Sequence, residues 1–191
     1  LRQAGLDLPQ VQAICLTHLD QDHFRPAWIP VLHGWGIRLW LHRWHLHGLL
    51  RYPGAAAMHA DGLVQTFDHH RFTPVAQAPA LEWLSIPLPH DQKGTCGFVI
   101  VSPQGRIGYA TDLGHVPRRL VQQFTIEGGV DILALESNYD PPMQLRSRRP
   151  ARLIKRNMEG KGHLSNAESD AAGQKIAQAS EHQRPQHIVI L

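Results

Sequence analysis

The sequence has few cysteines and no long apolar segment, and both absences narrow the class of protein. Only two of its 191 residues are cysteines, Cys15 and Cys96. Two are too few for a disulfide framework, and they favour a reducing, cytoplasmic compartment. No run approaches the roughly 20 apolar residues of a membrane helix, so we expect no membrane partner. The given sequence does not begin with Met and shows no signal-peptide pattern, so we expect no signal peptide.

The chain is poor in charge but rich in histidine. Charged residues make up 18% and hydrophobic residues 42%, a composition that excludes a disordered tail or a coiled coil. The net charge of +3 permits an anionic substrate without demanding one. The 14 histidines are unusually many for this length, which suggests that some of them bind metal.

Apolar runs of strand length alternate with helical patterns and include one hairpin, which predicts an α/β fold with mixed sheets. We expect a single domain over residues 1–191, with an irregular segment at 55–80 that contains one strand near 63–67. The predicted strands cover 11–16, 37–41, 81–88, 97–102, 106–110, 130–136 and 188–191. The predicted helices cover 44–50, 116–124, 142–158 with a break near Pro150, and a segment that Ser165 caps.

Both ends of the chain resemble parts of a larger domain. Residues 1–5 look like the last turn of a helix closed by a glycine, and residues 187–191 look like a core strand. We therefore expect a fragment that is incomplete at both termini.

The segment 17–23, Thr-His-Leu-Asp-Gln-Asp-His, is the strongest functional signal. His18, Asp20, Asp22 and His23 directly follow a predicted strand, so one tight loop can fold all four side chains around metal ions. Imidazole nitrogen and carboxylate oxygen are the ligands expected for zinc, manganese or iron. A solvated polar loop is the alternative interpretation.

Two further candidate ligands repeat this arrangement. His90 follows the predicted strand 81–88, and Asp112 follows the predicted strand 106–110. Each alone is explained as a surface histidine or a helix cap. Together they favour a set of ligands placed in loops after strands.

These residues carry a family resemblance. The run His-x-Asp-x-Asp-His, followed by His90 and Thr-Asp112, resembles the metallo-β-lactamase superfamily. The segments 135–140 and 162–166 are similar to its YycJ/WalJ-like branch, which is related to tRNA 3′-processing nucleases and cyclic phosphodiesterases. The resemblance implies a four-layer αββα sandwich with mixed sheets, here incomplete at both ends.

The resemblance also implies a ligand set for two divalent ions, with zinc as the first expectation. His18, Asp20 and His90 would hold one ion, Asp22 and His23 the other, and Asp112 would bridge them. The last ligand of the family is expected beyond Leu191. The family usually has histidine where this chain has Asp20, and the harder carboxylate makes manganese or iron possible.

Glu136 and His163 form a second predicted constellation. In the related nucleases a glutamate orients a histidine that protonates the leaving oxygen, and a residue at the position of Asp22 accepts a proton. The resemblance therefore implies a phosphodiesterase or nuclease that uses a metal-activated water. The structural alternative is that Glu136 caps a loop and His163 merely precedes a helix cap.

Other readings of the function remain open. A thioester, lactone or β-lactam hydrolase, a diiron redox domain, and a truncated metal-binding module without activity are the alternatives. The six cations within 146–156 are interpreted as either a solvated helix face or a contact to a phosphate backbone. The expected partner is a phosphodiester substrate, either a nucleic acid or a small cyclic phosphate. We expect His42, His45 and His47 on a surface helix, and His69 and His70 outside any site.

Overall fold

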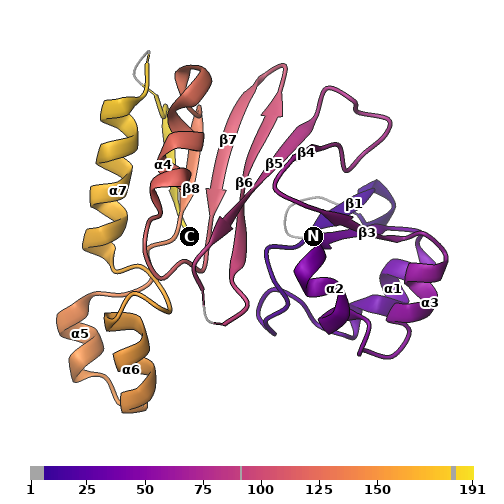
Figure 1. Cartoon of the computed structure of the whole chain (residues 1–191), viewed down its shortest axis with the longest axis horizontal. Helices are drawn as coiled ribbons and strands as arrows, with labels where there is room; N and C mark the ends of the chain where they lie inside the picture. Colours follow the sequence, from indigo (N-terminus) through magenta and orange to yellow (C-terminus); the bar gives the residue numbers. More distant parts are fainter. Residues whose placement is uncertain (1–6, 91, 182–183) are drawn as a thin grey trace. The chain divides into compact units, whose positions relative to one another are not determined.

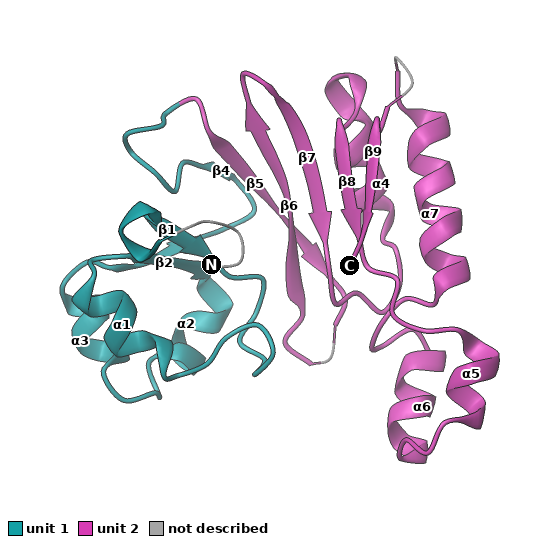
Figure 2. Cartoon of the chain, turned by 180° about the vertical axis from the view of Figure 1, so that it is seen from behind, with its two compact units in different colours: residues 1–79 teal, residues 80–191 magenta. Residues whose placement is uncertain are grey.

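The computed structural model describes residues 7–90, 92–181 and 184–191. Residues 1–5, expected as the end of a helix, lie outside these ranges. The chain forms two compact units, residues 1–79 and 80–191, which Figure 2 colours separately. The expectation of a single domain over residues 1–191 stays a prediction.

The first unit contains a parallel sheet in the order β1-β2-β3. Its register pairs Ile14 with Leu39, and Leu39 with Val64. Helices on the connections follow from the parallel pairing, because parallel strands need a crossover (Figure 1). The elements are η2 (Leu8–Gln10), β1 (Ala13–Cys15), α1 (Trp28–Gly34), β2 (Arg38–His42), α2 (Arg43–Leu49), α3 (Ala55–Ala60), β3 (Val64–Phe67) and β4 (Arg71–Phe72).

Two expectations about the first unit are wrong. The segment expected to be irregular begins with the helix Ala55–Ala60. Its run Ala-Ala-Ala-Met-His-Ala has high helix propensity, and Met58 packs into the core fully buried. His42 and His45, expected on a surface, are only 1% and 2% exposed: His42 is the buried last residue of β2, and His45 lies on the buried side of α2.

The second unit contains the mixed sheet that the sequence predicts, in the order β5-β6-β7-β8-β9. The pairs β5–β6 and β6–β7 are antiparallel, whereas β7–β8 and β8–β9 are parallel. Strands β5, β7, β8 and β9 therefore point the same way, and their carboxyl ends lie at one edge. The strands are β5 (Glu82–Leu88), β6 (Thr95–Ser102), β7 (Gly105–Ala110), β8 (Ile132–Leu135) and β9 (His187–Ile190).

Two helices pack against this sheet and complete its core. They are α4 (Arg118–Thr125) and α7 (Asn166–Ala179), which follows Ser165 (Figure 1). The absence of a side chain at Gly108 lets the Phe124 ring lie on β7, since a Cβ there would be 3.1 Å from the ring. Ser165 caps α7 as expected, in a capping box with Glu168.

The hairpin of α5 (Pro141–Arg146) and α6 (Ala151–Met158) extends past one end of α7 (Figure 1). The expected break near Pro150 separates the two helices. A short 3₁₀ turn, η3 (Ile126–Gly128), follows α4. Within the described ranges, no helix is long and apolar enough to cross a membrane. Cys96 is fully buried, and burial raises the pKa of its thiol to about 12.

Candidate metal centre

In the first unit, the loop after β1 holds the four residues of the His-x-Asp-x-Asp-His motif. His18 is 3% exposed, and its Nδ1 is 2.9 Å from the Thr17 hydroxyl oxygen. Its Nε2 lies 3.7 Å from an oxygen of Asp20. The hydroxyl contact fixes one ring nitrogen of His18 and leaves the other beside the carboxylate, as is typical of metal-binding histidines.

The second half of the loop repeats this pairing. The Nε2 of His23 lies 3.8 Å from an oxygen of Asp22, and the His18 and His23 rings are 4.4 Å apart. The Asp20 carbonyl closes the turn by accepting the amide N–H groups of His23 and Phe24, at 2.9 and 2.8 Å. Phe24 is 1% exposed and anchors the turn in the core.

These spacings fit metal binding better than hydrogen bonding. Both nitrogen–oxygen distances are longer than a hydrogen bond. Two ligands about 2.1 Å from a tetrahedral ion lie about 3.4 Å from each other, close to the observed values. The atoms that would bind the metal are imidazole nitrogen and carboxylate oxygen, so the loop fits a divalent transition metal.

In the second unit, the shared direction of the strands collects the other candidate residues. His90 follows β5, Asp112 follows β7 and Glu136 follows β8, at the same edge of the sheet. The Nδ1 of His90 is 2.8 Å from the Gly162 carbonyl, which fixes that nitrogen as the donor and leaves Nε2 for a metal. Ligand atoms of His90, Asp112 and His163 all lie within 4.8 Å of one another.

The backbone around Asp112 is specialised. Asp112 has a φ of +51°, a left-handed conformation that is uncommon outside glycine and more accessible to Asp than to most residues. Gly114 then passes so close to the other loop that a Cβ would be 2.1 Å from the Gly160 carbonyl oxygen. This close approach places Asp112 beside the segment that carries His163.

Glu136 connects the same two loops through hydrogen bonds. One carboxylate oxygen accepts the Leu113 amide N–H at 2.9 Å and the Leu164 amide N–H at 3.3 Å. The other oxygen is 2.5 Å from Nδ1 of His163. The structure therefore brings together Glu136 and His163, the pair that the sequence predicts.

His163 also contacts Asp112, with 3.2 Å between its Nδ1 and an Asp112 oxygen. Burial alone would lower the pKa of His163. The hydrogen bonds and negative charges of Asp112 and Glu136 outweigh burial and raise this pKa to about 9. The two carboxylates therefore favour the imidazolium form, which is the form that can donate a proton.

A third group with metal-binding atoms lies in the first unit, where His42, Asp68 and His69 are within 4.8 Å of one another. Here Nδ1 of His42 accepts the Trp44 amide N–H at 3.4 Å, so in the neutral ring the proton is on Nε2. Burial lowers the pKa of His42 to about 4, which keeps the ring neutral. A protonated Nε2 cannot bind a metal. We interpret this group as structural, with Asp68 also 3.1 Å from Arg43.

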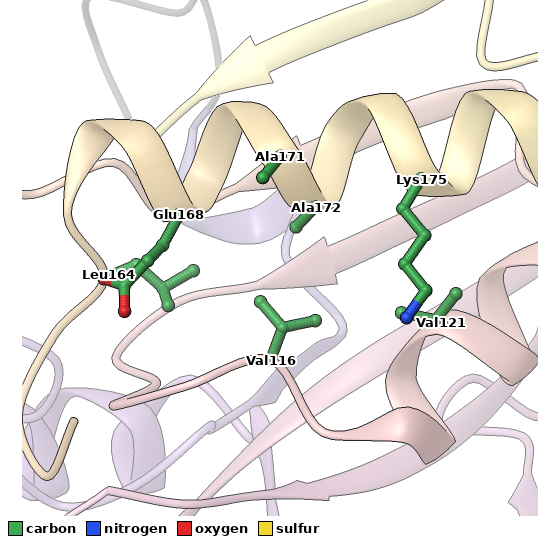
Figure 3. Close-up of a pocket in the computed structure, with 7 residues that line it drawn as sticks. All are labelled: Val116, Val121, Leu164, Glu168, Ala171, Ala172 and Lys175. Carbon is green, nitrogen blue, oxygen red and sulfur yellow. The ribbon is translucent and has the colours of Figure 1, made fainter.

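The second unit also contains a pocket of 240 Å³, and none of the candidate metal-binding side chains lines it. Figure 3 shows its lining residues. Its walls are mostly apolar, and the carboxylate of Glu168 is occupied by the Ser165 cap. We see no acid–base chemistry in it. Its lining residues are Val116, Val121, Leu164, Glu168, Ala171, Ala172 and Lys175.

Sequence reasoning missed the residues that support these side chains. Thr17 fixes His18, and the Gly162 carbonyl fixes His90. Thr17 precedes a candidate ligand directly, so its position was a usable signal. The carbonyl lies 72 residues from His90, and no local pattern indicates such a contact.

A family model described as "Beta-lactamase superfamily domain" matches residues 1–188. A comparison with curated protein sequences found no significant match.

Several solved structures share the fold at low identity. Zinc-bound PqqB from Methylobacterium extorquens is 20% identical with a TM-score of 0.62, covering 93% of this chain and 62% of that chain. A diphosphatase of the PhnP family is 14% identical with a TM-score of 0.60, covering 99% and 61%. Human short-form tRNase Z is 15% identical with a TM-score of 0.60, covering 100% and 80%. This chain thus spans about three fifths of the length of the first two. The expected metallo-β-lactamase fold is confirmed.

Proposed function

The chain belongs to the β-lactamase superfamily, and from that premise we propose that it is a metal-dependent hydrolase of phosphodiester bonds. The observation that carries the proposal is the contact between Glu136 and His163. A diphosphatase and a tRNase among the structural neighbours support a phosphoester substrate.

We propose the ligand assignment that the family resemblance implies. His18, Asp20 and His90 would hold one divalent ion, Asp22 and His23 would hold a second, and Asp112 would contribute to both. Two such ions, when bound, lower the pKa of a water molecule and offset the negative charge that develops on phosphate oxygens. Zinc is our first candidate, with manganese or iron favoured by Asp20.

The remaining chemistry belongs to side chains of this protein. Glu136 holds Nδ1 of His163, which fixes the ring and stabilises its imidazolium form. His163 then donates a proton to the departing oxygen, while Asp22 accepts a proton from the attacking water. An alkoxide leaving group needs this acid, whereas the thiolate of a thioester leaves without one, so the pair favours a phosphodiester over a thioester.

The test is the variant His163→Ala, assayed with two kinds of phosphodiester. We expect cleavage of an ester with a poor leaving group to slow by about 10²–10⁴-fold, the usual contribution of a positioned acid. The loss should shrink for bis-p-nitrophenyl phosphate, whose leaving group needs little protonation. Metal content, measured by mass spectrometry, should remain that of the wild type. His187→Ala, an exposed histidine on β9, is the matched control and should change neither quantity.

Other outcomes would reject parts of the proposal. Loss of metal in His163→Ala would make His163 a ligand, and equal losses with both esters would remove its role as the acid. Turnover of nitrocefin or a thioester, without turnover of phosphodiesters, would favour an acyl hydrolase. Metal binding without any hydrolysis would leave a metal-binding module.

A further inference from the structure

A basic helical arm is inserted between the two residues of the proposed acid pair. The arm is the α5–α6 hairpin, which begins five residues after Glu136 and ends five residues before His163. Residues 141–161, which include the arm, contain seven Lys or Arg and one Glu, a net charge of +6. The whole chain carries only +3, so the rest of the chain is net negative.

Most of this charge is exposed and is not neutralised by ion pairs. Within the described ranges, four exposed arginines of the arm have no carboxylate partner. Two of them contact only neutral oxygens, since Arg146 donates to the Pro142 carbonyl and Arg149 to the Gln144 side chain. The single acid, Glu159, already faces two lysines. The four arginines are Arg146, Arg148, Arg149 and Arg152.

The base of the arm is fixed to the loops of the proposed site. The Tyr139 hydroxyl donates to the Asn157 carbonyl at 3.1 Å. The Asn138 amide N–H donates to the Leu164 carbonyl at 3.1 Å. This hydrogen bond joins the segment that enters the arm to the segment that leaves it. Asn157 also packs on Gly162, where a Cβ would be 2.1 Å from its side-chain oxygen. The arm is therefore a rigid extension of the loop that carries His163.

We propose that the α5–α6 arm binds the phosphate backbone of a polynucleotide whose scissile bond lies at the Glu136–His163 pair. This rests on the proposed function and narrows its substrate to a nucleic acid strand. A small cyclic phosphate carries one phosphodiester and can use one or two cations, whereas the arm presents four unpaired arginines. The eight residues of α6 extend about 12 Å, the length of three to four nucleotides at about 3.4 Å each.

The arrangement favours a nucleic acid over an anionic membrane. Met143 and Leu145 are exposed beside the arginines, as in membrane-binding helices. However, α5 and α6 have only six and eight residues, and Pro150 interrupts them, so no continuous apolar face forms. Since α5 and α6 are inserted between Glu136 and His163, the proposed acid pair, we expect them to contact the substrate.

The test is binding of a fluorescein-labelled 20-nucleotide single strand, as RNA and as DNA, to the full chain in EDTA. Fluorescence anisotropy is measured at several salt concentrations, so the readout does not depend on activity. The variant is R148Q/R152Q. Each lost phosphate contact should reduce the slope of log K against log salt by about 0.7, so the slope should change by about 1.4. The matched control R119Q/K175Q removes two exposed cations from α4 and α7 and should leave the slope unchanged.

Kinetics separate this proposal from the proposed function. With metal added, R148Q/R152Q should raise KM for the oligonucleotide while kcat/KM for bis-p-nitrophenyl phosphate stays at the wild-type value. Arm-dependent binding without any phosphodiesterase activity would overturn the proposed function and leave the arm as a nucleic acid surface. Equal changes of the salt-dependence slope in R148Q/R152Q and in R119Q/K175Q would overturn the proposal that the arm binds the phosphate backbone. The proposal would also be overturned if R148Q/R152Q lost binding to phosphatidylserine vesicles while its binding to the oligonucleotide stayed at the wild-type level.

Discussion

The two groups of candidate residues are built in different ways. In the first unit, seven consecutive residues supply all four side chains, and the side chains of Asp20 and Asp22 are 56% and 76% exposed. In the second unit, four separate loops each supply one residue, and the side chains of Asp112 and Glu136 are only 7% and 3% exposed.

This difference has an energetic consequence. An exposed carboxylate remains solvated, so its presence or removal changes the free energy of unfolding little. A buried carboxylate must accept hydrogen bonds from buried N–H groups. Those N–H groups then lose their acceptor when the carboxylate is removed. We therefore expect substitutions of Asp20 and Asp22 to alter metal binding alone, and substitutions of Asp112 and Glu136 to alter stability as well.

The largest effect on stability should follow from Glu136→Ala. It leaves the amides of Leu113 and Leu164 buried without an acceptor, at about 1–3 kcal/mol each, so the free energy of unfolding should fall by about 2–6 kcal/mol. Urea denaturation measures this. Glu136→Gln is the control, because its amide oxygen can accept both N–H groups while its NH₂ no longer stabilises a His163 imidazolium. It should lose activity but little stability, and equal destabilisation by both variants would contradict the account.

A smaller loss is expected for Gly114→Ala. The new Cβ would overlap the Gly160 carbonyl, which is backbone and can move only with its loop. Overpacking of this kind costs about 1–3 kcal/mol, and the movement should separate Asp112 from His163 and reduce activity. Thermal unfolding and the phosphodiesterase assay measure the two effects. Gly34→Ala, where nothing lies within 4 Å, is the control; a similar loss in both variants would mean that the close approach is not important.

The smallest effect on stability is expected for Asp20→His. Its side chain is more than half exposed, so the free energy of unfolding should change by no more than about 0.5 kcal/mol. Imidazole in place of carboxylate should shift the metal preference towards zinc and away from manganese and iron. Competitive loading followed by mass spectrometry measures this. An unchanged preference would show that Asp20 does not bind the metal.

The contrast also explains how much the sequence could predict. The motif at 17–23 is local, so its spacing after a strand was sufficient to group the four residues. His90 and Asp112 were found because a repeated design, a ligand in the loop after a strand, applies to strands that point the same way. The mixed sheet was predicted because apolar strands alternate with helical patterns and include one hairpin.

What escaped prediction depends on contacts between distant segments. The burial of His42 and His45 follows from packing in the first unit, which their polar surroundings in the sequence did not indicate. The helix Ala55–Ala60 was obscured by its Pro- and His-rich neighbours. The requirement for Gly114 arises only because Gly160 passes beside it, and no pattern of residues encodes that approach.

The central claim is that the motif loop and the buried cluster both hold metal, whereas the group around His42 does not. Metal content per chain, measured by mass spectrometry, tests it most directly in His18→Ala, Asp112→Ala and His69→Ala. We expect the first two variants to hold less metal than the wild type and the third to hold the same amount. Wild-type metal content in Asp112→Ala, or loss of metal in His69→Ala, would contradict the account.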